Sequence, residues 1–216
     1  MRFPNKTLEK QLFKSGYQLV VGVDEVGTGS LAGPVVVCAV AMTNTFYNKH
    51  HKKLRRLRDS KLLLPHQREK FSKQLIRESN LAYAIASASP KVVDKINVYQ
   101  AARRAMKRAI VALRPIQGNK YCRTIVLIDG KTKINGLELE QMPIVKGDCK
   151  VFAIACASVI AKVHRDKMMV CYAKRYPGYG FERHKGYGTK YHQAQLLKQG
   201  PCAIHRESFA PVAKLI

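Results

Sequence analysis

The chain has 216 residues and a formal net charge of +25, because 39 lysines and arginines outnumber 14 aspartates and glutamates. Hydrophobic residues make up 46% of the sequence, which suffices for the core of one globular domain. Residues 1–10 lack the apolar stretch of a signal peptide, and the longest apolar run, 151–161, is too short to cross a bilayer. We therefore expect no membrane contact and a cytoplasmic protein, or a nuclear one if the source has a nucleus. Its charge favours polyanions such as nucleic acid.

The six cysteines show no C-x-x-C spacing, which speaks against a zinc knuckle or a redox pair. Without a secretory signal, we expect them to be reduced and mostly buried. No repeat or low-complexity tract divides the chain. We expect an N-terminal extension at 1–16, one domain at 17–212 and a short tail at 213–216.

Hydrophobic patterns predict an alternation of strands and helices along the chain. Strands are expected at 17–23, 35–42, 81–89, 124–128 and 143–145. Helices are expected at 65–79, 89–113, 148–172 and 189–198, the third of them capped by Asp148. The first two strands are close enough in sequence to pair as a hairpin. A hairpin followed by strands that alternate with helices indicates an α/β domain with a mixed β-sheet flanked by helices.

The helix expected at 89–113 has a basic face, formed by Arg103, Arg104, Lys107 and Arg108. Such a face can contact phosphates directly, but it can also be a solvated surface. From the sequence alone, we interpret it as solvated.

Acidic residues are scarce in this chain, yet four of them follow hydrophobic runs at predicted strand ends: Asp24, Glu25, Asp129 and Asp148. Carboxylates gathered at one edge of a sheet form a hard-oxygen site for Mg²⁺ or Mn²⁺. Two such ions can activate a water molecule and stabilise the leaving oxygen of a phosphodiester. Because neighbouring strand residues point to opposite faces, the adjacent acids can share one site only where the strand ends or twists.

The turn Gly27-Thr28-Gly29 follows the first two acids directly, and glycines there allow a ligand to approach the backbone closely. It lacks the spacing of a P-loop. Farther along, 176–189 mixes tyrosines, bases and glycines. That mixture suits a nucleic-acid surface, although a packed loop would have a similar composition.

Eight short motifs in this sequence resemble those of one family, ribonuclease HII, and they occur in that family's order between 17 and 212. They are GVDEVG at 22–27, LAGPVV at 31–36, DSKLL at 59–63, IDG at 128–130, VKGD at 145–148, ASVIAKV at 157–163, HKGYGT at 184–189 and SFAP at 208–211. The resemblance implies a ribonuclease H-like fold with a helical C-terminal region. It also implies endonucleolytic hydrolysis of RNA in RNA/DNA hybrids and incision 5′ of single ribonucleotides in duplex DNA, leaving 3′-hydroxyl and 5′-phosphate ends.

The same resemblance assigns roles to individual residues. It makes Asp24, Glu25, Asp129 and Asp148 the metal-binding catalytic carboxylates, in agreement with their placement. It implies that Gly27, Thr28 and Gly29 read the ribose, that Tyr187 stacks on the sugar beside it, and that Lys61 contacts substrate. Lys162, Arg165 and Lys185 are further candidates for the substrate groove, and for Lys162 and Arg165 a structural role is the alternative.

The chain departs from the family in one position that matters. Where the family has arginine between the two glycines, this sequence has Thr28. Loss of a charge-assisted phosphate contact is worth about 1.5–3 kcal/mol if nothing replaces it. The alternative to a nuclease is therefore a non-catalytic binder of hybrids or RNA, although a binder gains nothing from four clustered acids. A ribosome-associated basic protein would explain the charge but not the acids. We expect a monomer.

Overall fold

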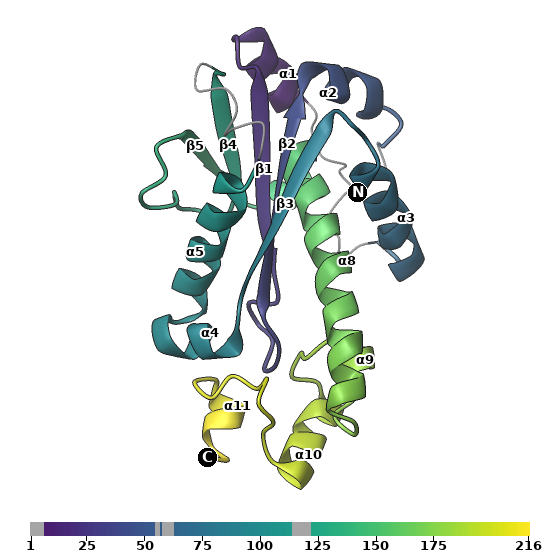
Figure 1. The fold of residues 1–216 in the computed structure, drawn as a ribbon, viewed down its shortest axis with the longest axis vertical. Helices are drawn as coiled ribbons and strands as arrows, with labels where there is room; N and C mark the ends of the chain where they lie inside the picture. Colours follow the sequence, from purple (N-terminus) through teal and green to yellow (C-terminus); the bar gives the residue numbers. More distant parts are fainter. Residues whose placement is uncertain (1–6, 55–56, 58–62, 114–121) are drawn as a thin grey trace.

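The structure is a computed structural model that describes residues 7–54, 57, 63–113 and 122–216. Five strands form one mixed sheet in the order β3-β2-β1-β4-β5, so that β1 lies in the middle (Figure 1). The strands are β1 (Leu19–Val26), β2 (Val35–Thr43), β3 (Leu81–Ala88), β4 (Thr124–Asp129) and β5 (Glu140–Ile144). β2 and β3 pair antiparallel to their neighbours, whereas β4 runs parallel to β1 and β5 parallel to β4. The predicted α/β architecture with a mixed sheet is confirmed.

The first strand continues beyond the end that the sequence predicts. Its ladder with β4 stops at the pair Val23–Ile128, but its ladder with β2 continues to Val26–Val36. The first two acids therefore lie inside β1 rather than after it, on a part of the strand that has no β4 partner. This one-sided end opens the sheet beside the acids.

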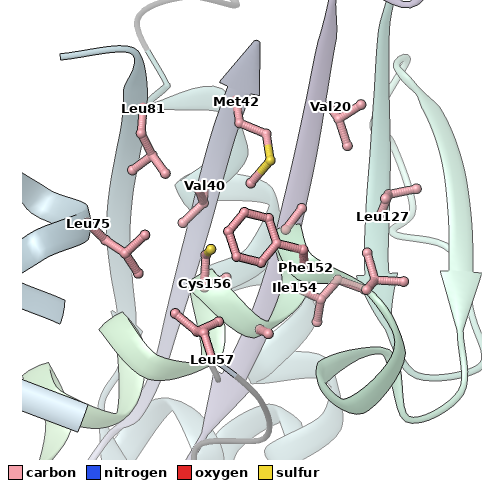
Figure 2. Packing of buried hydrophobic residues seen from close by; sticks show 14 of the residues in the cluster. Val20, Val40, Met42, Leu57, Leu75, Leu81, Leu127, Phe152, Ile154 and Cys156 are labelled. Carbon is pink, nitrogen blue, oxygen red and sulfur yellow. The ribbon is translucent and has the colours of Figure 1, made fainter. Parts of the chain in front are cut away.

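Helices cover both faces of the sheet (Figure 1). The helix α8 (Phe152–Arg175) packs on one face, where Val20 and Val40 belong to the same buried cluster as Phe152 (Figure 2). The helix α5 (Val98–Val111) covers the other face. A Cβ atom added to Gly22 would lie 2.2 Å from the carbonyl carbon of Ala153, so glycine permits this close approach of β1 and α8.

Two helices that the sequence predicts as continuous are each interrupted. The segment 89–113 forms α4 (Pro90–Ile96) and then α5, because Asn97 has a φ of 63° and its side chain caps α5 by accepting from the Gln100 N–H. The segment 148–172 forms α7 (Gly147–Lys150) and then α8, separated by the extended residue Val151. Asp148 therefore lies in the first turn of its own short helix instead of capping the long one.

Further helices surround this framework. They are α1 (Thr7–Lys14), α2 (Asn44–His50), α3 (Pro65–Ile76), α9 (Phe181–His184), α10 (Lys190–Gln199) and α11 (Ala210–Ala213). The first two were not predicted. Leu12 of α1 belongs to the main buried cluster, and the Ala153 N–H at the start of α8 donates to Glu9 at 3.0 Å. The last three form the expected helical C-terminal region, where Phe181 and Ile204 share a small core with Met169 of α8.

All six cysteines carry free thiols. The expectation that most of them are buried is wrong, because only Cys38 and Cys156 are. Across the described ranges, we find no helix with the length and apolar character needed to span a membrane.

Candidate functional site

Three carboxylates from separate elements meet beside the open end of β1. Oxygen atoms of Asp24 (β1), Asp129 (β4) and Asp148 (α7) all lie within 4.8 Å of one another. The Gly147 N–H donates to Asp129 Oδ1 at 2.7 Å, which ties the start of α7 to the end of β4. Lys146 just before it has a φ of 56°, so the backbone turns sharply to deliver Asp148. The acids predicted at separate strand ends are thus brought together.

The electrostatics of this cluster favour a cation. Asp24 is only 5% exposed, and burial raises its pKa well above the usual range of an aspartate. The charges of Glu25 and Asp129 raise that pKa further, while a hydrogen bond from Ser158 lowers it. A divalent cation among the three oxygens would relieve this repulsion. Because all three donors are hard carboxylate oxygens, the residues present suit Mg²⁺ or Mn²⁺.

Glu25 lines the same pocket as the three aspartates, but its carboxylate is not one of the three whose oxygens lie within 4.8 Å of one another. The pocket has a volume of about 310 Å³ and includes all four predicted carboxylates in its lining. In the alternation of β1, Glu25 has the parity of Val21 and Val23, whose side chains pack in the cluster under α5. Asp24 instead interacts with Ser158 of α8. The two adjacent acids therefore reach one pocket from opposite faces of the strand.

A buried arginine holds the glycine turn in place. Arg206 is 0% exposed, and its guanidinium donates to the carbonyl oxygens of Gly27 at 2.6 Å and Thr28 at 2.9 Å. It also donates to Gly33 O, at 3.1 Å from Nε and 2.9 Å from Nη2. Because a guanidinium presents its donors in a rigid plane, this contact fixes the start of the turn and ties it to Gly33.

The three turn residues differ in how the protein constrains them. Gly27 has a φ of +91°, and an added Cβ would lie 2.2 Å from Arg165 Nε, so only glycine is suitable there. Thr28 is half-buried and lines the pocket. Gly29 is exposed, with no described atom within 4 Å of an added Cβ. Packing therefore explains Gly27 but leaves room around Gly29.

Tyr187 reaches the same pocket from a distant part of the sequence. Its backbone forms a bridge with Ser30, and the Leu31 N–H donates to the neighbouring Gly186 O at 2.9 Å. Lys162 of α8 also lines the pocket; its ammonium lies 5.7 Å from the Tyr187 ring centroid and donates to Asp166 at 2.8 Å.

The expectation that Arg165 lines the groove is wrong, and the alternative structural role applies. Its side chain is 0% exposed and donates to the carbonyl oxygens of Ala32, Pro34 and Lys185. Lys185 has a φ of 54°, and its ammonium donates to Glu182 O. It does not line the carboxylate pocket. It lines a neighbouring groove, which shares Lys162 and Tyr187 with that pocket. Lys61 lies outside the described residues.

Three histidines form a cluster next to Tyr187, and one of them contacts its backbone carbonyl. His192 Nδ1 lies 3.0 Å from Tyr187 O, and its Nε2 lies 3.1 Å from Nε2 of His205. The His184 ring stacks on His192 with 4.4 Å between centroids. Burial lowers the pKa of both His192 and His205 to about 4. Neutral rings satisfy these contacts, because two facing Nε2 atoms need one proton between them.

Sequence reasoning missed two residues of this site. Ser158 was noted only as part of the motif at 157–163, and Arg206 lies two residues before the motif at 208–211 and was given no role. Nothing in the local pattern indicates that Arg206 reaches a turn 179 residues earlier.

A mixed sheet that delivers carboxylates from its central strand and the next parallel strand to one pocket defines a ribonuclease H-like, metal-dependent nuclease. The crystal structure of the ribonuclease H2 from Pyrococcus horikoshii OT3 superimposes with a TM-score of 0.71 at 25% identity, covering 91% of this chain and 96% of that one. The crystal structure of Bst-RNase HIII in complex with Mn²⁺ has the same fold, with a TM-score of 0.66 at 19% identity and coverage of 93% and 70%.

The sequence comparison defines the family more narrowly. The family model for ribonuclease HII matches residues 21–212. A ribonuclease HII from Caldicellulosiruptor bescii is 46% identical over 202 residues, which cover 94% of this chain and 91% of the relative. The chain belongs to the ribonuclease HII family. It is thus a metal-dependent endonuclease of the ribonuclease H type, and the resemblance seen in its motifs is confirmed.

Proposed function

We propose that this protein hydrolyses the RNA strand of RNA/DNA hybrids and incises duplex DNA on the 5′ side of embedded ribonucleotides. The observation that carries this proposal is the cluster of Asp24, Asp129 and Asp148, whose oxygens lie within 4.8 Å of one another. With Glu25 in the same pocket, four carboxylates are available to hold two cations. Bound there, divalent cations supply an activated water and stabilise the leaving 3′-oxygen.

The chain's own residues position the substrate. The peptide groups of Gly27 to Gly29 are proposed to read the ribose 2′-hydroxyl, because Arg206 fixes the turn and the space at Gly29 lets a ligand approach. Tyr187, whose backbone bridges to Ser30 just after the turn, is proposed to stack on the neighbouring sugar. Thr28 in place of the family arginine offers only a hydroxyl toward the adjacent phosphate.

Mg²⁺ or Mn²⁺ is the proposed cofactor, and the protein is proposed to act as a monomer. The Bst-RNase HIII neighbour was crystallised with Mn²⁺. The all-oxygen donor set here suits either ion.

The test is cleavage of two labelled duplexes, one a hybrid and one with a single ribonucleotide in DNA, with Mg²⁺ or with Mn²⁺. We expect 5′ incision at the single ribonucleotide, cutting of the hybrid, and no product after chelation of the metal. Asp129→Asn should lower kcat roughly 100-fold or more, because it removes several kcal/mol of charge stabilisation. Glu138→Gln, which alters an exposed acid, is the matched control and should cut normally.

Three other results would change the assignment. Cutting of the hybrid alone would mean that the turn with Thr28 no longer reads a single ribonucleotide. Tight binding of both duplexes without cleavage would favour the non-catalytic binder. Undiminished turnover by Asp129→Asn would refute the proposed mechanism.

A further inference from the structure

Two adjacent grooves run along the outer side of α5 and share two basic residues in their lining. The first, about 450 Å³, lies between α5 and the loop 132–135. The second, about 930 Å³, lies between α5 and the segment 87–92. Arg104 and Lys107 line both grooves, which makes them one continuous surface. We call it the α5 groove.

The charge of the α5 groove is not balanced by the protein. Lys133 and Arg103 add to its charge at one end and Arg108 at the other, and no acidic side chain is among the described residues that line it. Within the described part of the chain, neither Arg104 nor Lys107 forms a salt bridge. Concentrated like charge is unfavourable for the folded state by itself. An anionic ligand would remove that cost.

The α5 groove begins beside the catalytic carboxylates. Arg103 Nη1 donates to Thr132 O at 2.6 Å, three residues after Asp129. A Cβ added to Gly130 would lie 3.8 Å from Arg103 Nη2. Glu25 approaches the pocket from the same face of the sheet that α5 covers. A strand of nucleic acid that leaves the pocket on this side therefore meets the cations of α5.

The spacing of the cations suits a regular polyanion. Lys107 and Arg108 follow Arg104 by three and four residues, so both lie one turn from it on the same side of the helix, with their Cβ atoms about 5–6 Å from its Cβ. Arg108 is fixed by donation to Ser87 O, and Arg104 is exposed. Cations on two successive turns of one helix side can bind successive phosphates without reading sequence.

We propose that the α5 groove binds the phosphate backbone of the substrate duplex outside the cleavage site, so that it sets how much flanking duplex the enzyme uses. This inference rests on the proposed function, since it assumes a duplex in the pocket. It replaces the interpretation of the basic face as merely solvated. Arg104 and Lys107 become substrate-positioning residues, distant from the reacting phosphorus.

The test compares Arg104→Gln/Lys107→Gln with Lys10→Gln/Lys14→Gln. The control pair removes the same charge from two exposed positions on α1. α1 lies next to the start of β1, whereas Asp24 and Glu25 lie near the other end of that strand (Figure 1). Duplexes with one fixed ribonucleotide are shortened stepwise from either side. Binding is measured with the Asp129→Asn protein, and kcat/KM with the active enzyme.

We expect the α5 variant to bind the long duplex roughly 10-fold more weakly, with kcat unchanged. The slope of log K against log salt should become shallower by about 1–2, because each lost phosphate contact contributes about 0.9. Shortening one side of the duplex should weaken binding by the unmodified protein but not by the α5 variant, since the removed segment and the removed cations form one contact.

Equal losses in both double variants would overturn the proposal, because net charge alone would then explain them. The proposal would also fail if the α5 variant responded to shortening as the unmodified protein does. A failure of the proposed function gives a different result, because the enzyme would then cut no duplex. The difference in duplex binding between the α5 variant and the control variant would still test the role of the α5 groove.

Discussion

The two sides of the catalytic pocket use basic residues in different ways. On the side of α8, Lys162 pairs with Asp166, and the guanidinium groups of Arg165 and Arg206 are buried among backbone carbonyls. On the side of α5, Arg104 and Lys107 line open grooves and have no salt-bridge partner in the described ranges. Arg165 and Arg206 thus hold the protein's own backbone in place, while Arg104 and Lys107 are available to a ligand.

This difference indicates a division of labour in the proposed nuclease. Recognition of a ribose needs groups held in fixed positions, and internal hydrogen bonds provide that rigidity. Retention of a duplex needs charge that tolerates any sequence, which exposed cations provide. Changes on the α8 side should therefore alter stability and selectivity, and changes on the α5 side should alter affinity and its dependence on salt.

The largest effect on the α8 side should come from Arg206→Met. It removes the donors to the carbonyl oxygens of Gly27, Thr28 and Gly33, which lie in buried or half-buried backbone. We expect the free energy of unfolding to fall by about 3 kcal/mol or more, as measured in urea. Arg206→Lys should lose less, because it keeps the charge. A loss below about 1 kcal/mol for Arg206→Met would show that the turn does not depend on this residue.

Thr28→Arg would place a cation in the turn itself, beside the carboxylate pocket. The new side chain should contact the phosphate beside the ribose and contribute about 1.5–3 kcal/mol. We expect kcat/KM for a single embedded ribonucleotide to rise about 10-fold to 100-fold. Thr28→Gln is the control for added length without charge. Equal gains in both variants would exclude a charge-assisted contact.

Tyr187→Ala and Tyr187→Phe separate stacking from hydrogen bonding by this tyrosine of the pocket. Loss of the ring should weaken transition-state binding by about 1–3 kcal/mol, whereas phenylalanine keeps the stacking surface. We expect kcat/KM to fall at least about 5-fold for alanine and to stay near the original for phenylalanine. If alanine retained full activity on the embedded ribonucleotide, the proposed role of Tyr187 would be wrong.

Acidic pH should lower the free energy of unfolding, because the buried histidines His192 and His205 become protonated. The pKa of His192 and of His205 is about 4 in the folded protein and about 6.5 in an unfolded chain, so the unfolded chain binds more protons between these values. Stability should be fully present above about pH 6.5 and fall as the pH drops toward 4, by up to about 1.4 kcal/mol per pH unit for each histidine. Urea unfolding between pH 7 and pH 4.5 measures this slope.

His192→Gln should flatten the pH dependence. An equally steep slope in that variant would assign the effect to other groups. No described histidine lines the α5 groove, so its contribution to duplex binding should persist over this range in any protein that stays folded.

Much of the fold could be predicted because the signals are local. The hydrophobic runs of β1, β2 and β4, and the acids in or beside them, occupy contiguous stretches, and short-range pattern locates such elements well. The sequence also identified the four carboxylates and Tyr187, all of which line one pocket. Strand geometry predicted that Asp24 and Glu25 point to opposite faces of β1. It did not predict that this part of β1 has no β4 partner, which lets both side chains reach one pocket.

The remaining features depend on single backbone angles or on distant contacts. Asn97 and Val151 interrupt helices whose hydrophobic period continues across the break, so the period conceals the interruption. Arg165 has the composition of a groove residue, and only the packing of 32–34 around it shows that it is internal. The basic face of α5 was assigned to solvent because sequence does not reveal what lies beside it.

The bond between Arg206 and Gly27 also has a consequence for synthesis. A ribosome makes Gly27 first and adds Arg206 only after 179 further steps. A growing chain can therefore complete the sheet and its carboxylates long before the turn beside them is fixed. Because contacts between distant residues form late, the proposed recognition of the ribose should arise only after the metal site can form.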